Sequence, residues 1–90
     1  MELNSIEEVV EDLKKGKCVV IMDDENRENE GDVICAAEFA TTENVNFMAS
    51  YAKGLICMPM APEYTDKLHL PQMCITNTDN HCTAFSVSVD

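Results

Sequence analysis

Near the start of the chain, two β-rich runs flank a short and strongly acidic segment. The first run is CVVIM, residues 18–22, the second starts at Asp32 as DVICAAEF, and the acidic segment that joins them is DDENRENEGD, residues 23–32. A parallel pair of strands needs a crossover of about a dozen residues or more, so this connection predicts an antiparallel pair. Because CVVIM has no polar interruption, we expect its strand to be covered on both faces.

Helical patterns lie on both sides of this strand pair. Ser5 and Glu8 form a capping box, apolar residues then recur at helical spacing, and Gly16 ends the helix. The segment TTENVNFMASYAKG, residues 41–54, has a threonine cap, an apolar stripe and a terminal glycine, which predict a second helix. A third and shorter helix is expected from Pro62.

Two further strands are expected in the second half of the chain. LICMPM, residues 55–60, is a short apolar run closed by Pro59, and TAFSVSVD, residues 83–90, alternates apolar and polar side chains. Together these elements predict the α+β class, with a mixed β-sheet and helices packed against it. Because the last strand pattern runs to Asp90 without a turn, cap or tail, we interpret residues 1–90 as the N-terminal part of a single, truncated domain.

Charge and composition narrow the classes of function. Seventeen acidic residues against six basic ones give a formal net charge of −11, which repels nucleic acid and anionic lipid, so neither is expected as a partner. The chain has no basic and apolar leader and no apolar segment of membrane-spanning length, which favours a soluble, cytoplasmic protein. An odd number of cysteines without a C-x-x-C pair indicates reduced thiols, and these are Cys18, Cys35, Cys57, Cys74 and Cys82.

The acidic segment carries six carboxylates and a single guanidinium, that of Arg27. A solvated turn is the plainest interpretation, but carboxylates this close repel one another by up to about 1 kcal/mol per pair unless a cation relieves them. Mg²⁺ suits such a cluster, because it takes one or two protein carboxylates and leaves its other positions to substrate oxygens or water. In an extended loop Glu28, Glu30 and Asp32 would point to one side as a carboxylate row, and Gly31 would let the backbone approach a ligand closely.

Two other metal-site templates fit poorly. A calcium EF-hand with Gly31 at its sixth position places Ala37 where a bidentate glutamate must stand, so we reject it. Cys57 lies in an apolar run, which favours a structural thiol over a reactive one. The zinc-ligand residue types of the second half match no standard zinc spacing, and they are His69, Cys74, His81 and Cys82.

Three stretches, in this order, make the sequence resemble the 3,4-dihydroxy-2-butanone 4-phosphate synthase family: RENEGD at 27–32, GLICMPM at 54–60 and NTDNHCTAFSVSVD at 77–90. The likeness extends over the whole chain, and RENEGD is its most specific part. The resemblance implies an α+β homodimer with sites near the subunit interface. It also implies a lyase of riboflavin biosynthesis that depends on Mg²⁺, with Mn²⁺ as an alternative, and converts D-ribulose 5-phosphate to L-3,4-dihydroxy-2-butanone 4-phosphate and formate.

The resemblance also implies roles for individual residues. Glu28 is the implied metal ligand, Arg27 and Glu28 contact the sugar phosphate, and Asp32 binds substrate hydroxyls and takes part in proton transfer. Such residue types suit enolisation beside a ketone, which needs a base at the carbon and a cation at the enediolate oxygens. Three further residues match the catalytic motif or the neighbourhood of the pocket, namely Glu30 in the motif and Cys57 and Thr83 near the pocket.

The chain departs from the family in its second half. Members continue beyond the SVSVD strand, and the missing part carries a histidine that shares the metal, residues that bind the phosphate and a further essential acid. Neither His69 nor His81 matches that histidine. We therefore expect this chain alone to hold half a metal site and to have little or no lyase activity. The alternative is a non-catalytic, acidic metal-binding or interaction module that keeps the acidic segment without the chemistry.

Overall fold

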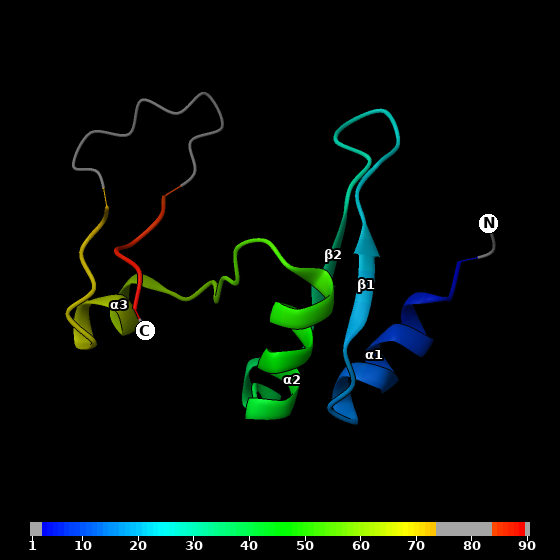
Figure 1. The fold of residues 1–90 in the computed structure, drawn as a ribbon, viewed down its shortest axis with the longest axis horizontal. Helices are drawn as coiled ribbons and strands as arrows, with labels where there is room; N and C mark the ends of the chain where they lie inside the picture. Colours follow the sequence, from blue (N-terminus) through cyan, green and yellow to red (C-terminus); the bar gives the residue numbers. More distant parts are fainter. Residues whose placement is uncertain (1–2, 74–83, 90) are drawn as a thin grey trace. The chain divides into compact units, whose positions relative to one another are not determined.

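The computed structural model describes residues 3–73 and 84–89, and the chain divides into two compact units, Met1–Cys57 and Met58–Asp90 (Figure 1). The first unit contains helix α1 (Ile6–Lys14), strands β1 (Val19–Met22) and β2 (Gly31–Ile34), a 3₁₀ turn η1 (Ala37–Phe39), helix α2 (Thr42–Phe47) and a π-helical turn η2 (Met48–Ala52). The second unit contains helix α3 (Pro62–Lys67). The single-domain organisation of residues 1–90 stays a prediction.

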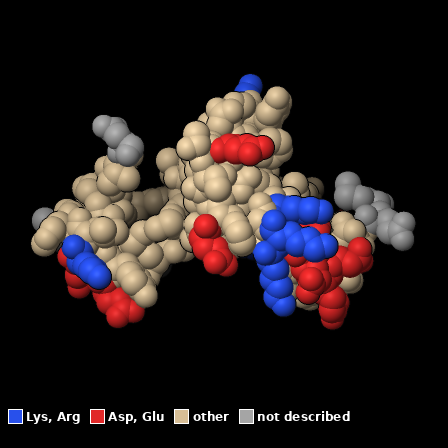
Figure 2. Space-filling model, turned by 90° about the horizontal axis from the view of Figure 1, so that it is seen from below, with Lys and Arg blue, Asp and Glu red and all other residues tan. Residues whose placement is uncertain are grey.

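Helix α1 begins at the predicted capping box. The Ser5 hydroxyl accepts a hydrogen bond from the Glu8 amide at 3.2 Å, and the Glu8 carboxylate accepts one from the Ser5 amide, also at 3.2 Å. The Ser5 backbone and hydroxyl donors hold the pKa of Glu8 below its ordinary value. Figure 2 shows basic side chains next to acidic ones over the part of the first unit that carries α1, in agreement with the exposed Lys14–Glu11 and Lys17–Asp12 ion pairs.

The two expected strands pair antiparallel, as their short connection predicted. Val19 lies opposite Ile34 and Met22 lies opposite Gly31. The α+β class is therefore confirmed, and the sheet of the described residues contains this one antiparallel pair, without the parallel strand that a mixed sheet requires. The expectation that β1 is covered on both faces was wrong, since none of its residues is buried and Val20 is 63% exposed.

The predicted helix at residues 41–54 forms in two parts. Thr41 caps α2 by accepting a hydrogen bond from the Asn44 amide at 3.1 Å. The chain then widens into the π-helical turn η2, in which the Lys53 amide donates to the Met48 carbonyl at 2.8 Å. The ring centroids of Phe47 and Tyr51 lie 5.2 Å apart across this change of geometry, so one helical face continues through both parts.

A junction between α1 and α2 fixes the base of the strand pair. Gly16 ends α1 in a left-handed conformation with φ of 83°, and a Cβ added there would lie 3.0 Å from the Phe39 ring. The Asn44 side-chain amide donates to the Gly16 carbonyl at 3.2 Å and to the Phe39 carbonyl at 2.7 Å. Both bonds are partly buried, so one side chain joins the end of α1, the 3₁₀ turn and the start of α2.

The second half differs most from its predicted elements. Helix α3 starts at Pro62 as expected, with proline in the first turn. The strand expected at residues 55–60 was wrong, because this stretch is irregular and pairs with no strand among the described residues. Of the strand expected at 83–90, the described residues 84–89 contain only an isolated bridge between Ser86 and Gln72, where Pro71 lacks the amide needed to extend a ladder.

Apolar side chains of the described residues remain largely in contact with solvent. None of the described residues is buried, and Ile6 and Leu55 are 78% and 76% exposed. A protein of this size that formed its own core would bury most of such side chains. No helix among the described residues has both the length and the apolar character needed to cross a membrane.

Candidate functional site

The acidic segment forms the loop of the β1–β2 hairpin, and residues 23–30 are called the hairpin loop below. The Asp23 amide donates to the Glu30 carbonyl at 2.9 Å, which extends the strand ladder by one pair. The Asp24 side chain then accepts a hydrogen bond from the Asn26 amide at 2.7 Å, and residues 25–28 form a turn. The loop lies at the end of the hairpin away from α1 and α2 (Figure 1).

Asp23 holds the turn in place with its carboxylate. One of its oxygens, Oδ2, accepts hydrogen bonds from the Arg27 Nη1 at 3.0 Å and from the Glu28 amide at 3.1 Å. The backbone amides of Glu28 and Asp24, with the Arg27 guanidinium, hold the pKa of Asp23 below its ordinary value. The side chain of Asp23 is only 25% exposed, whereas that of Arg27 is 67% exposed.

This positioning function of Asp23 was not predicted from the sequence. A usable signal was present, because an aspartate at the end of a strand and before a tight connection favours hydrogen bonds from its own side chain to nearby backbone amides. Asp23 therefore determines how the two residues of the RENEGD motif nearest to it, Arg27 and Glu28, are presented.

Arg27 and Glu28 lie side by side in the turn, as the motif predicted. The Arg27 Nη2 lies 3.5 Å from Glu28 Oε1, so the guanidinium bridges the carboxylates of Asp23 and Glu28. These two carboxylates also raise the pKa of Arg27, which stays cationic. The Glu28 side chain is 50% exposed, so its carboxylate is accessible to a cation from solution.

The predicted row of three carboxylates is not formed. Glu28 belongs to the turn, and Asn29 follows it with a left-handed φ of 51°, which breaks the two-residue alternation between Glu28 and Glu30. Alternation resumes only from Glu30 to Asp32, and Asp32 lies within β2 opposite Ile21. Of the three expected carboxylates, that of Glu28 therefore belongs to the turn, and those of Glu30 and Asp32 belong to the extended chain.

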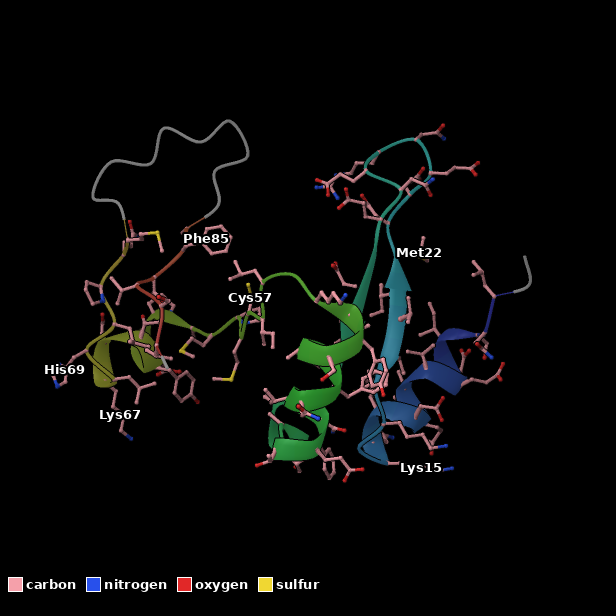
Figure 3. All side chains as sticks on the ribbon, viewed as in Figure 1. Lys15, Met22, Cys57, Lys67, His69 and Phe85 are labelled. Carbon is pink, nitrogen blue, oxygen red and sulfur yellow. The ribbon has the colours of Figure 1, made fainter. Side chains whose placement is uncertain are left out.

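Gly31 at the start of β2 leaves space that its neighbour across the hairpin occupies. A Cβ at Gly31 would lie 2.7 Å from the Met22 sulfur and 3.3 Å from a Val20 methyl carbon. Met22 lies at the loop end of β1 (Figure 3). The glycine therefore leaves room for the Met22 side chain to pack across the hairpin, and the close approach of a ligand expected at Gly31 stays a prediction.

The remaining candidate residues belong to the end of the first unit, to the second unit, or to the part of the chain outside the described residues. Cys57 is exposed in an irregular stretch at the end of the first unit (Figure 3), and among the described residues no hydrogen bond links it to the loop. Thr83 lies outside the described residues, as do Cys74, His81 and Cys82 of the zinc pattern. His69 lines a shallow, open hollow together with Thr65, Asp66, Leu70 and Pro71.

The donor set of the hairpin loop suits a hard cation but does not enclose one. In the described part of the chain, no three His, Cys, Asp or Glu side chains converge in a way that could hold a metal ion. Carboxylate oxygens are the ligands that Mg²⁺ prefers, and it needs only one or two of them from the protein. The accessible carboxylate of Glu28 therefore fits one corner of a magnesium site, with further ligands required from elsewhere.

Comparison with known proteins places these residues in a family. The family model described as 3,4-dihydroxy-2-butanone 4-phosphate synthase matches residues 7–90. The riboflavin biosynthesis protein RibBA of Bacillus mycoides is 55% identical over 85 residues, which are 94% of this chain and 21% of that protein. RibBA of Synechocystis sp. is 56% identical over 87 residues, which are 97% of this chain and 16% of that protein.

Two solved structures share the fold as well as the sequence. A 3,4-dihydroxy-2-butanone 4-phosphate synthase crystallised with two magnesium ions is 49% identical, with a TM-score of 0.85 over 98% of this chain and 41% of that one. RibBX, a two-domain 3,4-dihydroxy-2-butanone 4-phosphate synthase from A. baumannii, is 43% identical, with a TM-score of 0.73 over 86% of this chain and 23% of that one. The chain spans about a fifth of the length of the curated RibBA relatives of Bacillus. By the match of residues 7–90, the chain belongs to the 3,4-dihydroxy-2-butanone 4-phosphate synthase family.

Proposed function

We propose that this chain supplies the hairpin-loop part of the active site of a lyase that converts D-ribulose 5-phosphate to L-3,4-dihydroxy-2-butanone 4-phosphate and formate. The family match supports the reaction class. The observation that carries the proposal is the arrangement of RENEGD, in which Asp23 fixes the turn while Arg27 and Glu28 remain accessible. The single-domain organisation of residues 1–90, as the N-terminal part of a longer domain, belongs to the same proposal.

Glu28 is the proposed ligand for Mg²⁺, with Mn²⁺ as an alternative. It fits this role because its side chain is half exposed and its carboxylate lies next to the Arg27 guanidinium. A bound divalent cation would supply charge stabilisation at the oxygens that become anionic when the sugar enolises. The magnesium complex of a 49% identical synthase supports the choice of metal.

Arg27, Glu30 and Asp32 are proposed to act on the sugar phosphate itself. A guanidinium has five N–H donors, and Arg27 directs Nη1 and Nη2 to carboxylates, so donors remain for an anionic or hydroxyl oxygen of the substrate. Asp32 and Glu30 lie on the extended part of the hairpin, where Asp32 would hold substrate hydroxyls and either carboxylate could take up a proton. Thr83 and Cys57 are proposed as pocket residues near this group.

The site needs ligands that the described residues do not provide. Among the described residues no three metal-binding side chains converge, and we propose that residues beyond the hairpin loop complete both the metal site and the phosphate site. We propose that they come from the rest of the domain and from a second subunit, in a homodimer with sites near its interface. It follows that the ninety-residue chain alone releases no formate.

A chimera tests this proposal. The matched 85-residue stretch of the Bacillus mycoides protein is replaced by the corresponding residues of this chain, and formate release from D-ribulose 5-phosphate with Mg²⁺ is measured. The chimera is expected to retain activity within about tenfold of its parent, since a tenfold loss corresponds to only about 1.4 kcal/mol of transition-state stabilisation. The isolated chain serves as the control and should remain at background.

Two outcomes would count against the proposal. A chimera that matches its parent in circular dichroism and elution volume but releases no formate would favour the alternative, a non-catalytic acidic metal-binding module. Formate release by the isolated chain would show that the described residues hold a complete site, contrary to the incomplete set of metal-binding side chains.

A further inference from the structure

Two cysteines lie opposite each other at the base of the β1–β2 hairpin. Cys18 immediately precedes β1 and Cys35 immediately follows β2. In the antiparallel register Val19 pairs with Ile34, so the next pair outward is Cys18 with Cys35. This pair lies at the end of the hairpin opposite to the hairpin loop, and it takes no part in the function proposed above.

The hydrogen-bond alternation of the ladder identifies the geometry of this pair. The amide of Asp23 donates to the carbonyl of Glu30, which makes them a hydrogen-bonded pair. Hydrogen-bonded and non-hydrogen-bonded pairs alternate along an antiparallel ladder, and Cys18 is an odd number of steps from Asp23, so Cys18 and Cys35 form a non-hydrogen-bonded pair. The Cα atoms of such pairs are typically about 4.5 Å apart, which lies within the range of about 4.4–6.8 Å found in disulfides.

The immediate surroundings of the two thiols agree with this register. Both side chains are half-buried, whereas Cys57, the other described cysteine, is exposed. Residues paired across an antiparallel ladder project their side chains to the same face, so the register places both thiols on one face of the hairpin. Burial, followed by the proximity of Cys35, raises the pKa of Cys18, so a smaller fraction of this thiol is ionised at neutral pH than of an ordinary cysteine.

We propose that Cys18 and Cys35 form a cross-strand dithiol that small disulfides, such as oxidised glutathione, convert to an intramolecular disulfide. In the first step, one cysteine thiolate attacks the glutathione disulfide, forms a mixed disulfide and releases one glutathione as its thiolate. In the second step, the other cysteine thiolate attacks the protein sulfur of that mixed disulfide and releases the second glutathione. The protein loses two electrons and two protons, and one glutathione disulfide becomes two glutathione thiols.

The bridge would close the hairpin covalently at its base while leaving the loop free. The segment between the two cysteines contains Arg27, Glu28 and Asp32, so oxidation ties both ends of the strands that present them. Excess reduced glutathione or dithiothreitol reverses the exchange. The disulfide would therefore be a reversible modification of the β1–β2 hairpin, which carries the candidate active-site residues.

Peptide mapping of the unaltered chain tests the proposal. The chain is incubated with oxidised glutathione, its remaining thiols are blocked with N-ethylmaleimide, and it is digested with trypsin. Cleavage after Lys17, Arg27, Lys53 and Lys67 places Cys18, Cys35 and Cys57 in three separate peptides, so each linkage among these three gives a distinct mass, while Cys74 and Cys82 share the peptide 68–90. The same oxidation in concentrated urea supplies the control without the hairpin.

The expected product in native buffer is the linked pair of peptides 18–27 and 28–53. It should exceed each other linkage by roughly tenfold, because the hairpin raises the effective concentration of one thiol at the other. In urea the preference should fall toward chance, about one in ten, since five cysteines give ten pairs. Cys57→Ser should give the same yield of this linked pair as the unaltered chain. Cys35→Ser should accumulate a mixed glutathione disulfide at Cys18.

Three results would overturn the proposal. One is a stable mixed disulfide at Cys18 or Cys35 as the main native product of the unaltered chain. Another is linkage of either cysteine to Cys57 in equal or greater yield. The third is the same distribution of linkages in native buffer and in urea, which would mean that the hairpin does not position the pair.

Discussion

Replacement of Gly16 by alanine tests the junction that fixes the base of the hairpin. Gly16 has a φ of 83°, and an alanine in the left-handed region costs roughly 1–2 kcal/mol. The new Cβ would also lie 3.0 Å from Cδ1 and 3.2 Å from Cγ of the Phe39 ring. Overpacking of this kind typically costs about 1–3 kcal/mol, so the total expected for Gly16→Ala is roughly 2–5 kcal/mol.

Gly54→Ala is the matched control. Gly54 also has a positive φ, of 77°, but a Cβ there would meet no atom within 4 Å. Its cost is therefore the backbone part alone, roughly 1–2 kcal/mol. The difference between the two variants isolates the contact with Phe39.

Amide hydrogen exchange is the appropriate assay, because it reports local opening at single residues. The Lys17 amide donates to the Asp12 carbonyl at 3.0 Å across Gly16, so it reports the end of α1 directly. In Gly16→Ala its exchange should accelerate by at least roughly thirtyfold, which corresponds to about 2 kcal/mol, while Gly54→Ala should leave it unchanged within about threefold. Equal acceleration in both variants, or none in Gly16→Ala, would refute this account of the junction.

Three further predictions concern the junction and the hairpin loop. Asn44→Ala leaves the carbonyls of Gly16 and Phe39 without their side-chain donor, so the free energy of local opening, measured by exchange of the Lys17 amide, should fall by about 1–3 kcal/mol. In the control Asn46→Ala only an exposed contact with Ser50 is lost, and the same free energy should fall by less than about 0.5 kcal/mol. Because the pKa of Asp23 is lowered, its hydrogen bonds to Arg27 and the Glu28 amide should be complete above the ordinary aspartate pKa of about 3.9 and lost as the pH falls through the lowered pKa. The Glu28 amide resonance should follow this transition, and Asp23→Asn should abolish it. A transition that persists in Asp23→Asn would argue against the assignment. Titration with Mg²⁺ should shift the amide resonances of residues 23–32 more than those of α1, and an unmoved loop would favour a fragment without a ligand.

The elements near the start of the chain could be predicted because their signals are local. The Ser5–Glu8 capping box, the Thr41 cap and Pro62 at the start of α3 each act on backbone groups within one turn, and all three form as expected. The antiparallel hairpin followed from the length of its connection. Such features depend on the nearest few residues and so can be inferred from the sequence alone.

The incorrect predictions depend on distant partners. LICMPM has the composition of a strand, but a strand forms only where another chain segment offers its hydrogen-bonding groups, and none does so among the described residues. The same reason explains why β1 is exposed although its sequence is that of a covered strand. Apolar character indicates that a segment can be buried, whereas the structure determines whether something covers it.

In the candidate site, the membership of the residues stays a prediction, and the expected geometry of the carboxylates was wrong. RENEGD identified Arg27 and Glu28, which lie together, and the roles of Glu28, Glu30 and Asp32 remain predictions. The carboxylate row was wrong because Asn29 adopts a left-handed conformation that the two-residue alternation does not anticipate. Asp23 was overlooked because its role lies in hydrogen bonds to backbone amides, which a search for exposed functional groups does not consider.

The central claim is that Glu28 is a metal-binding carboxylate of the lyase site, and one pair of substitutions in the chimera tests it most directly. Glu28→Gln keeps the shape of the side chain and removes its charge, while Glu38→Gln makes the same change at an exposed position in η1, outside the motif. Formate release from D-ribulose 5-phosphate is measured for both at saturating Mg²⁺. The account predicts background activity for Glu28→Gln, a loss of at least about a hundredfold, and activity within about twofold of the chimera for Glu38→Gln. Equal losses in the two variants, or substantial turnover by Glu28→Gln, would contradict it.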